Sequence, residues 1–296
     1  MVKFLVVGDF HGKFSQKLFN KIKKENPDIL LSPGDFCGNK RWGKLFFKYS
    51  YGKEDSEIPK KIEKEMEQLE KKAINDGLLV FRKLKSLNKE TYSIMGNWDP
   101  GKYGYDIPAE FRRKDKKNFK IFKREYSKNF QQIDLEFKEF DKFILVGGAS
   151  STHPCKIDKK TIEKLIKNRD SKKEIKLRIK NYNFRQQKYE ELFKKAKLTK
   201  KLVIFLTHNA PYNTKLDKIK QGPAKGEHYG SYQERLLINR FKPDLVVTGH
   251  MHENFGKDKI GKSLIINSGT AMENNYITFE LAEKNSKIKN LSFKKV

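Results

Sequence analysis

The hydrophobic residues of this chain gather in short runs, and several of these runs stop at a polar loop, which in four of the five cases below contains glycine. Five runs follow this pattern: VKFLVV before GDFHG, DILLSP before GDFCGN, TYSIM before GNWD, LVIFL before THNAP, and DLVVT before GHMH. Short apolar runs that are bounded by glycine are typical of buried strands. Polar residues just past the carboxyl ends of strands build the sites of open α/β sheets. The pattern therefore predicts an α/β fold with a site at one edge of the sheet.

Helical patterns lie between these strands. Residues 13–26 are predicted to form the first crossover helix, and residues 57–86 form a longer amphipathic helix with apolar positions at helical spacing. We expect a single domain over residues 1–296, with Lys-rich helical insertions at about 40–88 and 156–200. Two interpretations of the second insertion stay open, a lid over the site and a solvated helical hairpin.

The charge of the chain is strongly positive, with a formal net charge of +28. Residues 156–201 alone hold 18 basic and 6 acidic residues, a net of +12. A basic surface attracts phosphates and nucleic acid. However, 55 of the 65 basic residues are Lys and 10 are Arg, whereas nucleic-acid readers rely on Arg for bidentate contacts. The charge favours an anionic substrate more than DNA or RNA.

The sequence also bears on the compartment. The spacing of the two cysteines, Cys37 and Cys155, fits neither a disulfide framework nor a zinc knuckle. The apolar stretch before Asp9 is too short for the core of a signal peptide, and no run is long enough to cross a membrane. We expect a cytoplasmic protein with no membrane partner.

Seven polar residues follow the predicted strands and form a candidate metal site: Asp9, His11, Asp35, Asn97, His208, His250 and His252. Mixed oxygen and nitrogen ligands suit first-row divalent metals. Seven ligands are too many for one ion and fit two ions that share a carboxylate. Two such ions can hold a bridging hydroxide and stabilise the attacking and leaving oxygens of a phosphoryl transfer.

The order GDFHG, GDFCGN, GNWD, THNAP and GHMH resembles the calcineurin-like metallophosphoesterase superfamily, from Gly8 to about Gly269. The segments THNAPYNTKLD, GEHYGS, INSGTA and VGGASSTHP are similar to those of one subgroup, the Icc-related predicted phosphoesterases of archaea and bacteria. The resemblance implies a four-layer α/β/β/α sandwich. It also implies two divalent metal ions; we expect manganese, with iron, nickel and zinc as alternatives.

The resemblance divides the ligands between the two ions. Asp9, His11 and His252 would hold the first, Asn97, His208 and His250 would hold the second, and Asp35 would bridge both. Asn97 is also a candidate catalytic residue.

Position 98 departs from the family pattern, because the turn that usually reads G-N-H-[DE] carries Trp98. An indole cannot release a proton at neutral pH, so the expected general acid is missing. Trp98 is a candidate substrate-binding residue that stacks on a ring of the substrate, with core packing as the alternative. We expect the neighbouring Asp99 to hydrogen-bond a ligand histidine.

His228 is the candidate catalytic residue that replaces the missing acid, and His153 is the alternative. His228 lies just before a helix that we expect to begin near Ser231, where Ser231 and Glu234 match the capping-box pattern.

The sequence therefore predicts a dinuclear-metal phosphoester hydrolase that prefers phosphodiesters to monoesters and attacks with the bridging hydroxide. One alternative is a metal-dependent nuclease or nucleotide phosphohydrolase, which the net charge of +28 favours. Another is a non-catalytic metal-containing binding protein that docks an acidic partner through residues 156–200. A missing acid alone would fit either a good leaving group or a retired active site, but the complete ligand set favours an enzyme.

Overall fold

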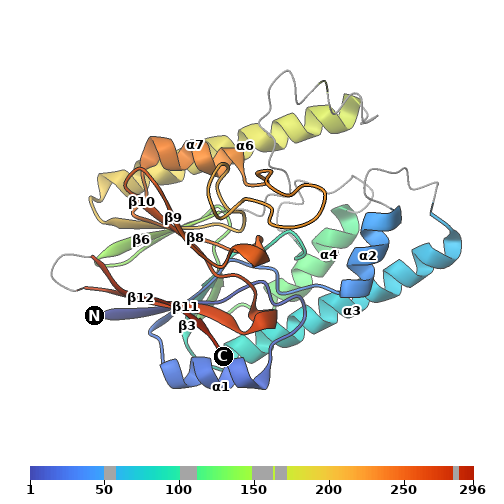
Figure 1. Cartoon of the computed structure of the whole chain (residues 1–296), viewed down its shortest axis with the longest axis horizontal. Helices are drawn as coiled ribbons and strands as arrows, with labels where there is room; N and C mark the ends of the chain where they lie inside the picture. The colour runs from blue at the N-terminus through green and yellow to red at the C-terminus, as the bar shows by residue number, and fades with distance from the viewer. Residues whose placement is uncertain (50–57, 101–111, 149–162, 164–171, 283–286) are drawn as a thin grey trace.

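The computed structural model describes residues 1–49, 58–100, 112–148, 163, 172–282 and 287–296. Two six-stranded sheets pack face to face, and helices cover both outer faces (Figure 1). This four-layer arrangement confirms the predicted α/β sandwich.

The first sheet has the strand order β12-β11-β1-β2-β3-β4. Strands β1 to β4 are parallel, and β11 and β12 extend the sheet in antiparallel fashion. The strands are β1 (Val2–Val6), β2 (Ile29–Ser32), β3 (Glu90–Ser93), β4 (Phe130–Gln132), β11 (Asn275–Leu281) and β12 (Ile288–Lys295).

The second sheet has the order β5-β6-β7-β8-β10-β9, with a parallel centre and antiparallel strands at both edges. The strands are β5 (Phe137–Glu139), β6 (Phe143–Gly147), β7 (Leu202–Leu206), β8 (Leu245–Thr248), β9 (Gly256–Ile260) and β10 (Ser263–Asn267). Parallel central strands point their carboxyl ends to one edge, and this positions the site.

The helices belong to the two outer layers. Those of the first sheet are α1 (Gln16–Glu25), α2 (Lys40–Tyr49), α3 (Lys60–Lys85) and α4 (Arg112–Lys123). Those of the second sheet are α6 (Lys172–Leu198) and α7 (Tyr232–Phe241). Two single turns, η2 (His252–Asn254) and η3 (Ala271–Glu273), lie in the loops. The division of the chain into one domain with two insertions stays a prediction.

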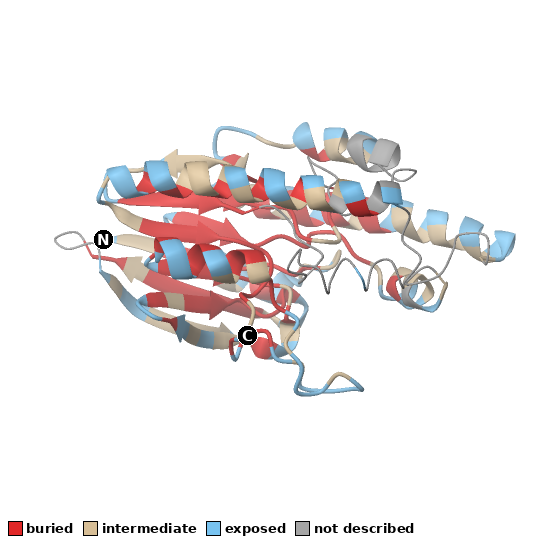
Figure 2. Ribbon diagram, turned by 90° about the horizontal axis from the view of Figure 1, so that it is seen from above, coloured by how far each residue is buried: buried red, intermediate tan, exposed pale blue. Residues whose placement is uncertain are grey.

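Strand β1 shows why the central strands read as unbroken apolar runs. Phe4 and Val6 face the second sheet, while Leu5 packs against the helical layer with Leu18 and Ile22 of α1. Each face of the strand is therefore covered, and every residue from Phe4 to Val6 is fully buried. Figure 2 shows the buried strands between helices whose outer sides are exposed.

Helix α7 begins where the sequence predicts, but its cap is only half of a capping box. The Ser231 hydroxyl accepts a hydrogen bond from the Glu234 backbone N–H at 3.4 Å. The Glu234 carboxylate instead accepts from the Thr207 hydroxyl at 3.2 Å. The side chain of Glu234 therefore ties α7 to the end of β7, beside the ligand His208.

Among the described residues, no helix is long and apolar enough to cross a membrane.

Glu25, at the end of α1, joins three strands of the first sheet through one carboxylate. It accepts hydrogen bonds from Lys3 at 3.0 Å, Tyr276 at 2.9 Å and Lys294 at 2.9 Å. Burial alone would raise the pKa of Glu25, but the hydrogen bonds from Lys294, Lys3 and Tyr276 outweigh burial and lower the pKa to about 2.

We expect Glu25→Gln to lower the free energy of unfolding by about 1–2 kcal/mol at pH 7. The native pKa lies below the ordinary value of 4.5, so this stabilisation is complete above pH 4.5 and is lost as the pH falls towards 2. Urea unfolding at pH 7 and pH 3 measures both differences. Glu139→Gln is the control, because the Glu139 side chain is 48% exposed and its pairing with Lys201 contributes little. Equal stability of Glu25→Gln and wild type at pH 7 would contradict this account.

Candidate metal centre

All seven predicted ligands lie in loops that follow central strands of the two sheets. Asp9 and His11 follow β1, Asp35 follows β2, and Asn97 follows β3. The remaining three follow strands of the second sheet: His208 after β7, and His250 and His252 after β8. The site thus forms where the carboxyl ends of the central strands of the two sheets lie side by side.

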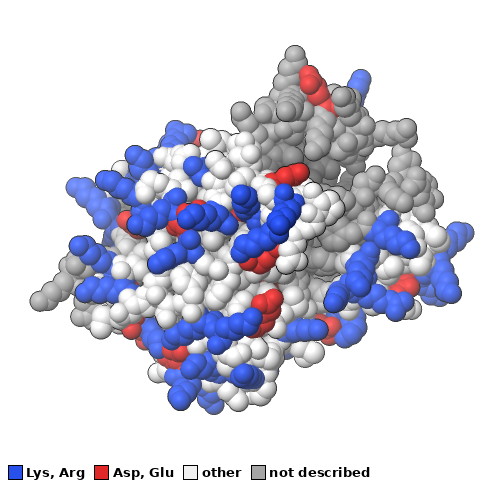
Figure 3. Space-filling view, in the orientation of Figure 1, with Lys and Arg blue, Asp and Glu red and all other residues white. Residues whose placement is uncertain are grey.

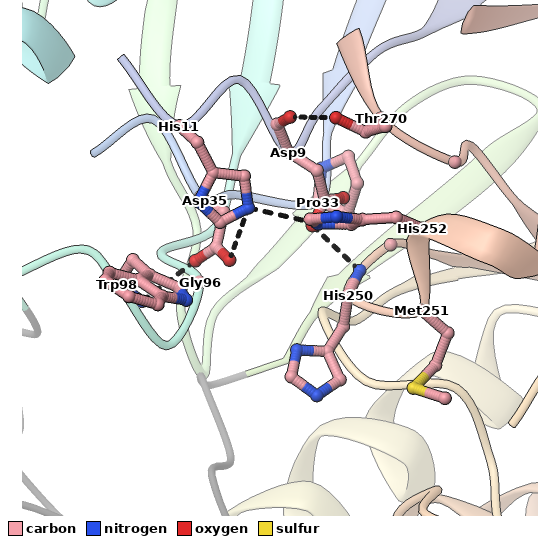
Figure 4. A network of polar contacts seen from close by, with 12 residues as sticks. Asp9, His11, Pro33, Asp35, Gly96, Trp98, His250, Met251, His252 and Thr270 are labelled. Carbon is pink, nitrogen blue, oxygen red and sulfur yellow. Dashed lines mark hydrogen bonds and ion pairs between the residues drawn. The ribbon is translucent and has the colours of Figure 1, made fainter. Parts of the chain in front are cut away.

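One cluster consists of Asp9, His11 and His252, whose ligand atoms lie within 4.8 Å of one another. The Nε2 atoms of His11 and His252 are 3.0 Å apart, and Nε2 of His252 is 3.1 Å from Oδ1 of Asp9 (Figure 4). The other oxygen of Asp9, Oδ2, is buried without a hydrogen-bond partner. This is the set that the family resemblance implies for the first ion.

A second cluster consists of Asp35, His208 and His250, again within 4.8 Å. Asn97 joins it, because its Oδ1 lies 2.7 Å from Nε2 of His208 and 2.8 Å from Nδ1 of His250. Asp35 lies between the two clusters. Its Oδ2 is 3.5 Å from Nε2 of His11 and 3.5 Å from Nε2 of His208.

Hydrogen bonds from outside the clusters orient these ligands. Nδ1 of His208 donates to the carbonyl of Pro33 at 2.8 Å, which directs Nε2 into the site. The backbone N–H of Trp98 donates to Oδ1 of Asp35 at 2.9 Å, and that of His250 donates to Oδ1 of Asp9 at 2.9 Å. One oxygen of each carboxylate is thus fixed by the backbone.

The backbone of the ligands is itself unusual. Asp9, His11, Asp35 and His250 have φ values of 54°, 46°, 56° and 65°, in the left-handed region that residues other than glycine seldom adopt. Such strain persists where the surrounding structure enforces it, and it collects at functional sites.

Two glycines make room for the carboxylates. A Cβ at Gly96 would lie 2.1 Å from Oδ1 of Asp35, and one at Gly249 would lie 2.2 Å from Oδ2 of Asp9. Only glycine fits at these two points.

The charges of the two carboxylates divide the histidines electrostatically. Burial would lower the pKa of His208, but the charge of Asp35 and its hydrogen bond raise it to about 9. Burial and the charge of His208 lower the pKa of His250 to about 4. Burial also lowers the pKa of His11, although the charges of Asp35 and Asp9 oppose this shift. The pKa of His252 is raised, because its hydrogen bond to Asp9 and the carboxylate charges outweigh burial. The pKa of Asp35 is lowered despite burial, chiefly by His208.

This arrangement fits divalent cations. Oδ1 of Asn97 lies 2.7 Å from Nε2 of His208 and 2.8 Å from Nδ1 of His250, so three potential ligand atoms lie close together. Two ligands about 2.1 Å from one ion, at a right angle, are about 3 Å apart. The Nε2 atoms of His11 and His252 have this spacing, at 3.0 Å. The unpartnered Oδ2 of Asp9 offers a further ligand atom.

The expectation for Asp99 is wrong, because its carboxylate bonds backbone and no histidine. Oδ1 accepts from the N–H of Cys37 at 2.8 Å, and Oδ2 accepts from the N–H of Gly96 at 2.9 Å. Burial and the charge of Asp35 raise the pKa of Asp99 to about 6, against these N–H donors. Asp99 therefore ties the loop that carries Asp35 to the loop that carries Asn97.

Trp98 lies beside the first cluster. The centroid of its ring is 5.7 Å from that of His11 and 5.0 Å from that of Trp42 in α2 (Figure 4 shows it next to His11). Trp42 was not predicted as a site residue, because a single aromatic residue in a helical segment carries no signal of its own.

His228 belongs to neither ligand cluster. Its Nδ1 lies 2.7 Å from Oδ1 of Asp217, which is fully buried. Asp217 also accepts backbone N–H bonds from Asn213, Thr214 and Gly230, at 2.7–3.0 Å. The contact of Asp217 with His228 was not predicted, although the segment THNAPYNTKLD ends with Asp217. The alternative acid, His153, lies outside the described residues.

Comparison with known proteins agrees with this geometry. The family model described as calcineurin-like phosphoesterase matches residues 2–254, which confirms the resemblance. No curated protein matches the chain. One crystal structure is similar with a TM-score of 0.57 at 16% identity, over 99% of this chain and 98% of that one. Protein TT1561 of Thermus thermophilus is similar with a TM-score of 0.52 at 14% identity, over the same shares.

Purple acid phosphatase PPD1 from yellow lupin (Lupinus luteus) seeds is similar with a TM-score of 0.48 at 12% identity, over 99% of this chain and 51% of that one. At these identities, the two structures with TM-scores above 0.5 show the fold alone.

We expect wild-type protein to bind two divalent ions per chain and His208→Ala to retain about one. His208 belongs only to the second cluster, so the first cluster keeps all its ligands in this variant. Elemental analysis after loading with manganese, and separately with zinc, measures the stoichiometry. His228→Ala is the matched control and should keep two ions. Equal metal content in wild type and His208→Ala would contradict the assignment.

We expect Asp99→Ala to lower the free energy of unfolding by about 1–3 kcal/mol, because two buried N–H groups lose their acceptor. Asp99→Asn keeps one acceptor oxygen and should lose less. Chemical denaturation measures both variants in the metal-loaded protein. A smaller loss in Asp99→Ala than in Asp99→Asn would rule out the proposed tie between the two loops.

Proposed function

Because the chain belongs to the calcineurin-like phosphoesterase family, we propose that its two ligand clusters hold two divalent ions and hydrolyse phosphodiesters in preference to monoesters. The chain is a metallophosphoesterase, a hydrolase of phosphoric ester bonds. The observation that carries the dinuclear site is the position of Asp35, whose Oδ2 is 3.5 Å from a histidine of each cluster.

When bound, the two ions would lower the pKa of a water, which makes it a nucleophile towards phosphorus at neutral pH. They would also neutralise charge on the phosphate oxygens. The protein orients this chemistry. Pro33 fixes the tautomer of His208, and the backbone N–H of Trp98 fixes Asp35. Asn97 directs its amide oxygen to the second cluster, and the nitrogen on the same carbon can donate to a phosphate oxygen there.

The leaving group explains the preference for diesters. Trp98 has no proton to give at neutral pH. A diester arm of low basicity leaves without protonation, and a diester brings less negative charge than a monoester. The lack of a proton donor at position 98 and the lower charge of a diester both support this preference.

We assign the role of general acid to His228, for leaving groups that require a proton. Asp217 holds Nδ1 of the imidazole, which leaves Nε2 as the atom that exchanges a proton. The loop that carries both residues is anchored beside the ligand His252. Asn254 donates to the carbonyl of Lys218 at 2.9 Å, and the N–H of Lys220 donates to Glu253 at 2.9 Å.

The net charge of +28 supports an anionic substrate, and the face seen in Figure 3 carries no continuous basic track among its described residues. Figure 3 shows Lys and Arg side chains in several separate groups on the viewed face. A nucleic-acid interface would require a continuous basic track along the backbone. A nuclease or nucleotide phosphohydrolase stays an alternative, whereas membership of a hydrolase family disfavours the non-catalytic binding protein. Manganese as the native metal and a cytoplasmic location stay predictions.

We expect metal-loaded protein to cleave bis(p-nitrophenyl) phosphate faster than p-nitrophenyl phosphate. His250→Ala should reduce this turnover at least about 100-fold, because the second cluster loses a ligand. Parallel assays with manganese, nickel and zinc identify the effective metal. Tyr229→Phe, a change at an exposed side chain, is the control. Metal-loaded protein that cleaves neither ester would contradict the proposed function.

A dialkyl phosphodiester tests His228 separately, because an alkoxide needs a proton and p-nitrophenolate does not. His228→Ala should lower kcat on the dialkyl ester by about 10²–10⁴-fold and leave the aryl ester nearly unchanged. Asp217→Asn should weaken the same step. Equal losses on both esters would show that His228 acts through structure and not as an acid.

A further inference from the structure

Both tryptophans of the chain lie at one place, at the rim of the first ligand cluster. Trp42 comes from α2 and Trp98 from the loop after β3, and their rings are 5.0 Å apart at an interplanar angle of 71°. The ring of Trp98 is also 5.7 Å from that of the ligand His11. Trp42 also stacks on Phe46, with ring centroids 5.3 Å apart.

This aromatic group does not belong to the hydrophobic core. Among the described residues, three core clusters fill the spaces between the layers, and neither Trp42 nor Trp98 is part of them. Both side chains are only partly buried. Because indoles contribute large buried areas when they pack in a core, two partly exposed indoles in contact, one of them beside a metal ligand, indicate a binding surface.

The position of Trp98 is fixed from two directions. Its backbone N–H is bonded to Asp35. The far edge of its ring meets Gly43 of α2, where a Cβ would lie 2.8 Å from Cη2 of the indole. Asn39 caps the start of α2 by accepting the N–H groups of Arg41 and Trp42, at 3.0 and 3.1 Å. A ring held in this way loses little conformational freedom when a ligand binds.

The helix that carries Trp42 is basic. Its sequence KRWGKLFFKY holds four Lys or Arg residues and no acidic residue; Arg41 pairs with Glu65 of α3. Positive charge next to an aromatic surface suits a ligand that combines a planar ring with phosphate.

We propose that Trp98 and Trp42 form a binding site for the nucleobase of a nucleoside phosphate whose ester bond is cleaved at the metal centre. The proposal rests on the proposed function and narrows its substrate class. A nucleoside joins a planar ring to a phosphate ester through one sugar, which suits the short separation between Trp98 and His11. An indole at position 98 cannot protonate a leaving group, but it can stack on the base of the substrate.

Intrinsic fluorescence reports directly on this site, since Trp42 and Trp98 are the only tryptophans. Metal-loaded full-length protein is titrated with AMP, with excitation at a wavelength where the base does not absorb. AMP should quench the emission in a saturable way, whereas ribose 5-phosphate, which carries the same phosphate without the base, should not. Calorimetry gives the affinity for both ligands.

Trp98→Ala should weaken AMP binding roughly 5- to 150-fold and leave ribose 5-phosphate binding unchanged. The hydrogen bond to Asp35 uses the backbone of residue 98 and survives the substitution, and elemental analysis confirms that metal content is kept. Trp98→Phe should restore part of the affinity. Phe184→Ala, a partly exposed aromatic residue of α6, is the control and should bind as wild type.

A short oligoadenylate distinguishes the source of the base. Trp98-dependent binding of AMP supports a free nucleotide, and Trp98-dependent binding of the oligoadenylate alone supports a strand end. If neither depends on Trp98, or AMP and ribose 5-phosphate bind equally, the proposal is overturned. In that case turnover of bis(p-nitrophenyl) phosphate still decides the proposed function independently.

Discussion

The concentration of acceptor atoms in one buried place is the constraint on which the rest of this structure depends. Asp9 and Asp35 are buried, and carboxylates in such surroundings cost several kcal/mol unless cations or N–H groups face them. Backbone N–H groups satisfy one oxygen of each. The left-handed backbone at four ligands and the two glycines that admit the carboxylates serve the same arrangement. The local strain makes sense as the cost of directing the remaining acceptor atoms to a common point.

The sandwich supplies what the loops alone could not. One sheet delivers Asp9, His11, Asp35 and Asn97, and the other delivers three histidines, so the ligand set is complete only when the two sheets have packed. The apolar cluster between the sheets performs this alignment, since it joins residues of β1, β2 and β3 to residues of β6, β7 and β8. Core and metal centre are therefore parts of one assembly, and destabilisation of the first disturbs the second.

The sequence predicts those features of the fold and the site that depend on the types of side chain along the chain. Strands such as β1 and β7 are covered on both faces and thus leave continuous apolar runs, and the ligands follow them in motifs. Strand β12 was not predicted, because it is a half-exposed edge strand with scattered lysines. The role of Asp99 was predicted wrongly, because its partners are backbone N–H groups that no residue type announces. The pairing of Trp42 with Trp98 joins residues far apart in the chain, which one sequence cannot reveal.

The tie made by Asp99 links the two ion positions mechanically. It fastens the loop of Asp35, which lies between the clusters, to the loop of Asn97, which belongs to one of them. An ion that shifted one of these loops would shift the other with it, which would couple the two positions. The two positions should then fill cooperatively, and a change at one should be felt as an altered affinity at the other. In this protein a carboxylate that touches neither ion would set how sharply activity responds to the supply of metal.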